Sequence, residues 1–476
     1  MMSWSQAEVC GAKIANTRRR NNLASILDGL AEKPALSFSA AVGSAKRQAF
    51  HRLCRVDTSG EKPVPLVQVD DLLGGHFEQT QSRIGDETGG GLVLLVQDTS
   101  MYNFAGLKQV PDLGYCNSKG ERCLFGHSMI ALTVEGLPLG VAHLDLWCRD
   151  DADHGKTKAR RDKEIKDKES FRWIRALHTV EARLPEGQPA LFIQDREADI
   201  FAFLEAPKRA TTFVLVRAAQ SRRVEVDVPG EDKPRKGLLL DVAHSAPVVG
   251  QMEVNIPRAP NREASVINLL VQTVCVRIIP PSDRKGIGDK PITAWVVRAS
   301  EMHPPTGEKA IEWILVTTMP VTTPEQAFQM VRYYSKRWVI ERLHYTIKSG
   351  GCNAERLQMD DVHSIKLALA LYYVTAWRLL FITYLARTKP NAPATTILND
   401  TEIQVLQMVE NKPVTTCAMA VVAVAKLGGY EPYKNGPPPG VKRLWIGLRR
   451  LEDMAAGWQL AKQNLPLTPG QVMIHD

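Results

Sequence analysis

The sequence lacks the closely spaced cysteines of a structural zinc site. Its eight cysteines are scattered over 476 residues, and none forms a Cys-x-x-Cys pair. Structural zinc ions are commonly held by such pairs, so we predict no zinc site. Scattered cysteines are typical of reduced thiols in a cytosol, and we expect these thiols to be free.

Long apolar runs are also scarce. The first 20 residues contain no apolar signal core, which favours a cytoplasmic protein. Only residues 367–386 resemble a membrane span, and Arg378 lies in the middle of that run. Placing an arginine at the centre of a membrane helix costs about 2.5–3.5 kcal/mol, so we predict a buried helix instead.

The overall composition is that of a soluble globular protein. Apolar residues make up 44% of the chain, charged residues make up 24%, and the formal net charge is +8. The chain length predicts about three domains. The positive charge favours a polyanionic partner such as nucleic acid.

Residues 1–65 are expected to form a basic helical domain. One helix is predicted at 16–32 and a second from about Ser44, with Phe50 and Leu53 facing inward. The region holds ten Lys and Arg against five Asp and Glu, an excess that suits phosphate contacts. We predict DNA binding here, although a solvated helical face is the alternative. The candidate contacts are Arg18, Arg19, Arg20, Lys46 and Arg47.

Residues 66–390 show the order of a ribonuclease-H-like α/β core. Continuous apolar runs indicate two buried strands, one ending around Asp98 and the other at Asp195. The predicted order is strand, two-stranded hairpin, helix, strand, short helix and strand, at residues 92–96, 128–135 and 139–148, 170–184, 190–194, up to 204, and 212–217. Acidic residues therefore follow the first and fourth strands of this core.

Two further regions flank or interrupt the core. Short β-like pieces between about 218 and 310 predict a β-rich insertion, and residues 391–476 are expected to form a helical C-terminal domain. The last helix has apolar residues at heptad-like spacing, which indicates either a self-association seam or a helix packed on its own domain. These residues are Val441, Leu444, Leu448, Leu451, Ala455 and Trp458.

Residues 331–350 carry charged side chains in a helical pattern. If the stretch is helical throughout, Tyr334, Arg337, Glu341 and Lys348 share an arc of roughly 60°. Such a face on its own is most often a solvated surface. A chemical role requires partners from elsewhere in the chain.

Asp98 and Asp195 are the candidate partners of Glu341 in a metal site. In-line attack at phosphorus can be catalysed by two divalent ions about 3.5–4 Å apart. Hard ions such as Mg²⁺ or Mn²⁺ prefer carboxylate oxygens, so three converging carboxylates suffice. Arg337 and Lys348 would then hold the phosphate.

The same residues have simpler explanations. Each aspartate can also be a turn former or a helix cap. Tyr334, which the metal-site hypothesis has donating a hydrogen bond to the phosphate, shares its face with charged residues that are most often solvated. Glu197 and Asp199 are rival ligands beside Asp195, and such residues more often cap a helix or pair with an arginine.

Three stretches together resemble a known family. The spacing Tyr334-x2-Arg337-x3-Glu341-x6-Lys348 resembles the signature of bacterial cut-and-paste DDE transposases of the insertion-sequence-four family. The segments 97–100 and 195–199 are similar to the stretches around the two catalytic aspartates of that family. The similarity extends over nearly the whole chain, although the N-terminal helices match only in outline.

The resemblance implies a DNA transposase with a metal-binding catalytic triad of Asp98, Asp195 and Glu341. Each active site would use two Mg²⁺ ions, for which Mn²⁺ can substitute. The reaction implied is nicking at transposon-end inverted repeats, hairpin formation, and joining of the 3′ ends to target DNA. Trp313 would hold a flipped base, although from the residues alone it is a core residue, and Arg217 would approach DNA.

The family also implies double-stranded DNA as partner, a synaptic homodimer with contacts from the C-terminal helix, and a place in the bacterial cytoplasm at the nucleoid. Two other functions stay open. A ribonuclease-H-like nuclease would cut branched DNA without strand transfer, and a domesticated DNA-binding protein would occupy transposon ends without cutting them.

Overall fold

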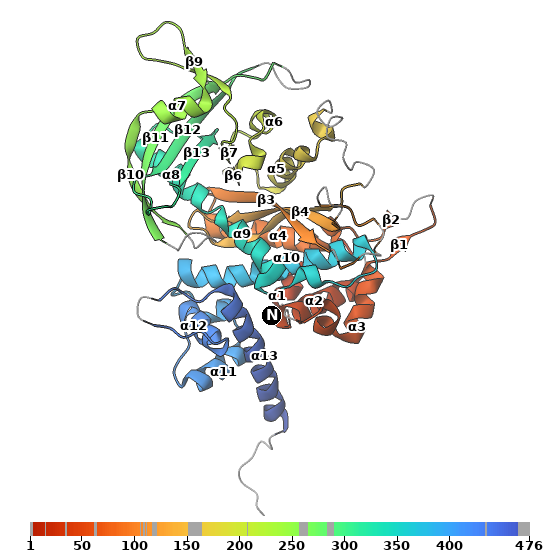
Figure 1. Cartoon of the computed structure of the whole chain (residues 1–476). Coiled ribbons are helices and arrows are strands. Elements are labelled where there is room, and N and C mark those ends of the chain that lie inside the picture. Colours follow the sequence, from red (N-terminus) through yellow and green to blue (C-terminus); the bar gives the residue numbers. More distant parts are fainter. Residues whose placement is uncertain are drawn as a thin grey trace, which may run out of the picture.

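The fold is described from a computed structural model, shown in Figure 1. The described residues are 3–464, with gaps at 15, 34–35, 61–63, 105, 108–109, 111, 117–120, 151–163, 207, 257–264, 283–289 and 434–435. Helices gather at the two ends of the sequence, and one large sheet occupies the middle.

Four helices and a small hairpin precede the sheet. Their bounds are α1 Trp4–Val9, α2 Thr17–Glu32, α3 Phe38–Leu53, β1 Val56–Asp57, β2 Val64–Pro65 and α4 Val69–Thr88. Asn16 caps α2, because its side chain accepts a hydrogen bond from the Arg19 N–H. Gly43, at φ 75°, breaks α3, so its second part starts at Ser44, as predicted. Phe50 and Leu53 are buried.

The core sheet follows the predicted order of strands and helices. Its elements are β3 Val93–Asn103, β4 Cys123–Leu132, β5 Pro138–Trp147, α5 Arg172–Arg183, β6 Ala190–Gln194, α6 Phe201–Glu205 and β7 Thr212–Arg217. The spatial order is β5-β4-β3-β6-β7, with β3, β6 and β7 parallel and the hairpin antiparallel. This mixed sheet is consistent with a ribonuclease-H-like core.

Two details of the core differ from expectation. The strand β3 does not end around Asp98 but continues to Asn103, because β4 pairs with it along its whole length. Cys116 and Cys123 are joined as a disulfide rather than free, since the bridge between Tyr115 and Arg122 brings the two segments together.

The β-rich insertion extends the core sheet instead of forming a separate one. Its elements are β8 Arg223–Val226, β9 Arg235–Leu238, α7 Leu239–Ser245, β10 Val248–Ile256, β11 Ser265–Ile278 and β12 Ile292–Glu301, and β13 Glu312–Thr317 follows. The strand β13 pairs with β7, which joins insertion and core into one eleven-stranded sheet. The sequence pattern indicated these strands apart from β9, and it did not indicate α7.

The charged stretch after β13 is not one helix. It comprises α8 Pro324–Ser335, α9 Trp338–Tyr345 and a π-helical turn, Thr346–Gly350. Between α8 and α9 the backbone tightens, because the N–H groups of Lys336 and Arg337 bond carbonyls three residues back. The continuous helix predicted for 331–350 was therefore wrong. The break could not be foreseen, because neither glycine nor proline marks it in the sequence.

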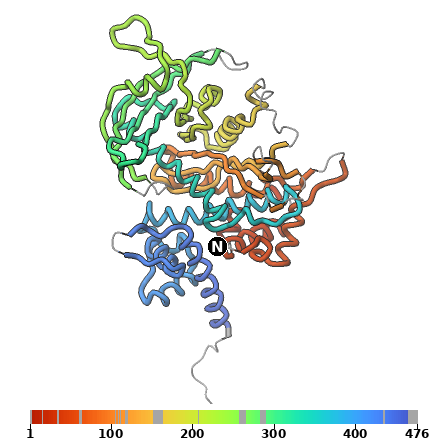
Figure 2. The backbone as a smooth tube through the Cα atoms, viewed as in Figure 1, coloured from red at the N-terminus to blue at the C-terminus, as the bar shows by residue number. Residues whose placement is uncertain are grey.

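The next helix, α10 Val362–Thr388, lies across one face of the sheet, together with the N-terminal and C-terminal helices (Figures 1 and 2). It is long and apolar enough to cross a membrane, but 83% of its most apolar window is buried inside the molecule. Arg378, in its middle, stacks over the Trp4 ring at 4.0 Å. The prediction of a buried helix is therefore confirmed.

Three more α-helices follow among the described residues: α11 Asp400–Glu410, α12 Cys417–Leu427 and α13 Val441–Asn464. The helices α12 and α13 pack on α10, and α11 packs on α12 and α13. Of the heptad-like residues in α13, Leu444, Leu451 and Ala455 are buried against their own domain. These positions therefore do not form an exposed seam. Apolar side chains that α13 does expose are Met454 and Leu460.

Candidate active site

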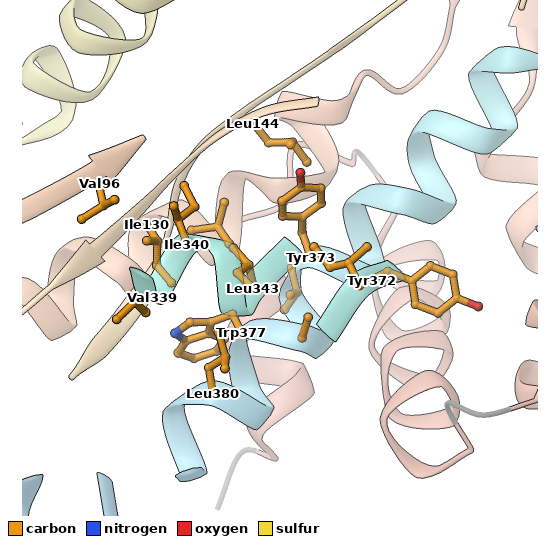
Figure 3. Packing of buried hydrophobic residues seen from close by; sticks show 14 of the residues in the cluster. Val96, Ile130, Leu144, Val339, Ile340, Leu343, Tyr372, Tyr373, Trp377 and Leu380 are labelled. Atoms are coloured by element: carbon orange, nitrogen blue, oxygen red, sulfur yellow. The ribbon is translucent and has the colours of Figure 1, made fainter. Parts of the chain in front are cut away.

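Asp98 lies in β3 on the sheet face that α9 covers. Figure 3 shows the apolar part of this contact, where Val339, Ile340 and Leu343 of α9 pack near Val96, Ile130 and α10. Burial and then the neighbouring Asp195 raise the pKa of Asp98 to about 7, and Glu341 adds to the rise. The carboxylates of Asp98, Asp195 and Glu341 are thus close enough to interact in one partly apolar site.

Asp195 directly follows β6, the parallel neighbour of β3. Its side chain caps the short 3₁₀ helix Arg196–Ala198, because Oδ1 accepts a hydrogen bond from the Glu197 N–H at 2.8 Å. The capping role weighed from the sequence is therefore real. It leaves the other carboxylate oxygen, Oδ2, for another ligand.

Glu341 projects from the first turn of α9 and pairs with Arg337. Nη2 of Arg337 donates to Oε1 of Glu341 at 2.5 Å, and the guanidinium is mostly buried whereas the carboxylate is more than a third exposed. Burial lowers the pKa of Arg337, but Tyr334, Glu341 and Asp98 raise it above its ordinary value. The cation therefore stays charged among the carboxylates.

Tyr334, Trp313 and Arg217 form one group beside the carboxylates. Tyr334 is buried, which raises its pKa, and its hydroxyl is hydrogen-bonded to Arg217. The rings of Trp313 and Tyr334 meet edge to face at 5.3 Å. Trp313 itself is buried on β13, so in this state it is a core residue, the alternative raised from the sequence.

Lys348 approaches the site from the π-helical turn. Its Nζ lies 5.4 Å from the centre of the Tyr102 ring. Burial lowers the pKa of Lys348, while Glu355 and Asp98 act in the opposite direction. All four residues of the spaced motif thus face the two aspartates, even though the helix that carries them is broken.

The rival ligands are engaged elsewhere. Glu197 pairs with Arg172 at 3.0 Å. Asp199 accepts hydrogen bonds from Arg222 and from the backbone N–H groups of Ala219 and Gln220. Both therefore stabilise the loop after β6, which is the simpler role.

Several residues near the site were not singled out from the sequence. The Arg337 guanidinium lies 5.3 Å from the Trp338 ring centre. His344 and Ser128 form a buried hydrogen bond of 2.9 Å that ties α9 to β4. Nothing in the spacing of the sequence marks the bond between His344 and Ser128, because these residues lie 216 positions apart.

The candidate DNA contacts of the N-terminal helices lie apart from the carboxylates. Arg18, Arg19 and Arg20 form the first turn of α2, and Lys46 and Arg47 lie on α3. Arg47 also lines a cavity of about 290 Å³ between α3 and residues 358–360. Arg18 and Arg47 are exposed, as a phosphate contact requires.

The donor set fits a divalent cation. Burial, and then the charges of Asp195 and Glu341, raise the pKa of Asp98, and a cation beside its carboxylate would offset both effects. Among the described residues, no three His, Cys, Asp or Glu side chains stand close enough together to hold an ion as they are. The Glu341 carboxylate forms an ion pair with the Arg337 guanidinium instead.

A comparison with protein families agrees with this site. The model of the family described as "Transposase DDE domain" matches residues 141–378, half of the chain. The match runs from β5 into α10, and it contains Asp195 and Glu341 but starts after Asp98. This family acts in DNA transposition and implies divalent metal ions. The chain therefore belongs to the DDE transposase family and is a catalytic transposase.

Proposed function

We propose that this transposase excises its element by cut-and-paste transposition, with Asp98, Asp195 and Glu341 as the catalytic metal ligands. One observation carries the proposal: burial, and then the charges of Asp195 and Glu341, raise the pKa of Asp98 to about 7. Carboxylates that repel each other in a partly buried site are a common mark of a functional centre. Bound Mg²⁺, or Mn²⁺ in its place, would activate the attacking water or hydroxyl and stabilise the leaving oxygen.

The basic side chains around the carboxylates would hold the DNA strand. Lys348 offers an ammonium group, and Arg337 offers a planar guanidinium that matches phosphate oxygens. The present ion pair between Arg337 and Glu341 supports a switch of partner, in which Arg337 binds phosphate when Glu341 binds metal. Tyr334 and Arg217 would contact the same backbone.

Hairpin formation is the proposed route to a double-strand break. The 3′-hydroxyl freed by nicking would attack the opposite strand, and Trp313 would stack on a base turned out of the helix. Because Trp313 is packed against Tyr334, this role requires the pair to open. The flipped base would then take the place of the Tyr334 ring as the aromatic neighbour of Trp313.

We further propose that the N-terminal helices read inverted repeats at the transposon ends. The exposed side chains of Arg18 and Arg47 support this, together with the resemblance to the insertion-sequence-four family and, within it, to the transposase of transposon five. The 3′ ends would be joined to target DNA. The reaction would take place in the bacterial cytoplasm at the nucleoid.

A homodimer is proposed for the complex that pairs the two ends. Support comes from the exposed Met454 and Leu460 on α13, whose last turns project beyond the body of the molecule in Figure 1. Each protomer would then bring one catalytic site to the assembly.

A cleavage assay tests the proposed function. Linear DNA that carries the inverted repeats flanking the gene is incubated with the protein and Mg²⁺ or a chelator, and the products are separated on a denaturing gel. Hairpin-ended fragments are expected only with metal, and Glu341→Ala should abolish them.

The matched control is Glu325→Ala, which removes an ion-paired but exposed carboxylate from the adjacent α8. It should cleave like the unaltered chain. Binding without any cutting would point to a DNA-binding protein, and nicking that ignores the repeats would point to a structure-specific nuclease.

A further inference from the structure

Two buried glutamines immediately precede the two catalytic aspartates. Gln97 stands before Asp98 and Gln194 before Asp195, and neither glutamine side chain is exposed to solvent. Burying an amide is costly unless its donors and acceptors are satisfied. Their positions at the ends of the two apolar runs therefore call for a physical reason.

The glutamines meet where the backbone pairing of their strands stops. The parallel register of β3 and β6 ends at Val96 and Ile193, so the next residues in line are Gln97 and Gln194. With the Gln194 amide oriented so that its nitrogen donates to the carbonyls of Phe192 and Leu215, its oxygen accepts from Gln97 Nε2 at 2.9 Å. A side-chain bond thus continues the link between the strands.

The other end of the Gln97 amide is held as well. Oε1 of Gln97 lies 3.0 Å from Nε2 of His127, and Nδ1 of His127 lies 2.9 Å from the Thr99 hydroxyl. Arg172 Nε donates to that hydroxyl, so the hydroxyl proton is free to bond Nδ1. His127 is then neutral and carries its proton on Nε2, where Gln97 accepts it.

The chain of hydrogen bonds returns to the second aspartate. Arg172 also binds Glu197 at 3.0 Å, and the Glu197 N–H donates to Asp195 at 2.8 Å. The segments that carry Asp98 and Asp195 are therefore joined twice. One link is the buried amide pair, and the other runs over Arg172 of α5.

We propose that Gln97 and Gln194 are positioning residues that set the separation of the Asp98 and Asp195 carboxylates for divalent metal binding. The inference rests on the proposed metal site. The glutamines point to the α5 face of the sheet and Asp98 to the α9 face, so the amide pair does not touch the metal. It resists the mutual repulsion of the two carboxylates, which would move β3 and β6 apart where their backbone pairing ends.

The direct test measures Mn²⁺ binding to the full-length chain by titration calorimetry. The variants Gln97→Met and Gln194→Met keep the side-chain length and remove the hydrogen bonds of the side-chain amides. Mutation of a residue that orients a metal ligand typically weakens metal affinity 10- to 100-fold. Each variant should therefore raise the Mn²⁺ dissociation constant at least about tenfold. The double variant should be no weaker than the weaker single one, because both residues belong to one link.

Val93→Ala is the matched control, since Val93 is buried on the same strand and the same sheet face and pairs with Ala190. It should lower the melting temperature and leave Mn²⁺ affinity unchanged. Melting curves fix a temperature at which all variants are folded. If Gln97→Met does not fold at any temperature, Gln194→Met alone decides the outcome.

Two results would overturn the inference while the metal site stands: wild-type affinity in the glutamine variants, or an equal loss in Val93→Ala. A different result would remove the metal site itself. If the double variant Asp98→Asn, Asp195→Asn binds Mn²⁺ as tightly as the unaltered chain, the proposed ligands are wrong, and the positioning role falls with them.

Discussion

At the proposed catalytic carboxylates, charge and burial work against the folded state. Burial and the adjacent Asp195 raise the pKa of Asp98 to about 7, and the Thr99 N–H and Arg337 offset only part of this rise. The ionised Asp98 carboxylate therefore lowers the stability of the folded state, whereas an apolar side chain at this buried position would not. Such a cost is expected where a cation completes the site.

Asp98→Asn should stabilise the metal-free protein at pH 8. The folded pKa near 7 lies above the ordinary value of 3.8, so the stabilisation from protonated Asp98 is complete below about pH 4 and is lost as pH rises through 7. At pH 8 the gain in unfolding free energy should be about 1–4 kcal/mol, and at pH 5 it should be much smaller. Denaturant unfolding in chelator at both pH values measures it, and an equal gain at the two pH values would contradict it.

The sequence indicates some site residues and conceals others for a simple reason. Tyr334, Arg337, Glu341 and Lys348 lie close together in the chain, so their spacing is visible. The pair Gln97 and Gln194 and the bond between His344 and Ser128 join distant segments, and only the fold brings them together. The role of the catalytic trio itself stays a prediction.

At the scale of elements, the pattern of apolar residues predicts strands better than it predicts breaks. The order of β3 to β7 follows from alternating and continuous apolar runs. The tightened turn between α8 and α9 and the short helix α7 leave no such mark. The motif therefore reaches the aspartates from α8, from the turn that holds Arg337, from α9 and from the π-helical turn.

The first helix is locked to the core by a buried ionic cluster. Glu8 of α1 accepts from Arg83 of α4 at 2.6 Å and lies 2.5 Å from Nδ1 of His76. Nε2 of His76 accepts the Val141 N–H, so the ring is neutral with its proton facing Glu8. Burial alone would raise the pKa of Glu8, but His76 and Arg83 together lower it.

Glu8→Ala should therefore destabilise the protein strongly. Removing one partner of a buried pair leaves the other charge uncompensated, which costs about 3–5 kcal/mol. Differential scanning calorimetry should show a clear fall in melting temperature. Glu78→Ala, an exposed carboxylate on α4, is the control and should change stability by less than about 0.5 kcal/mol. A fall of the same size in both variants would argue against the cluster.

At the scale of the molecule, α10 is the element on which the parts assemble. It contacts β5 and α9 of the core, α2 and α4 of the N-terminal part, and α12 and α13 of the C-terminal part. Its apolar length was visible in the sequence, but its partners were not. The heptad-like pattern of α13 was equally ambiguous, since packing on its own domain and dimerisation both require apolar residues at that spacing.

The two sets of apolar residues on α13 should behave differently. Leu451→Ala removes a fully buried side chain and should cost about 2–5 kcal/mol of stability without a direct effect on assembly. Leu460→Glu changes an exposed residue, so it should leave the melting temperature unchanged and weaken the paired-end complex. Light scattering of the DNA complex measures assembly. Unaltered dimer formation by Leu460→Glu would place the protomer contact elsewhere.

The central claim is that three carboxylates act as one metal-dependent centre, and single-turnover nicking of an end duplex tests it most directly. Groups that act as a unit are strongly non-additive. Asp98→Ala, Asp195→Ala and Glu341→Ala should each reduce nicking to background, and Asp98→Ala, Asp195→Ala combined should reduce it no further. Partial activities that multiply in the double variant would contradict the account.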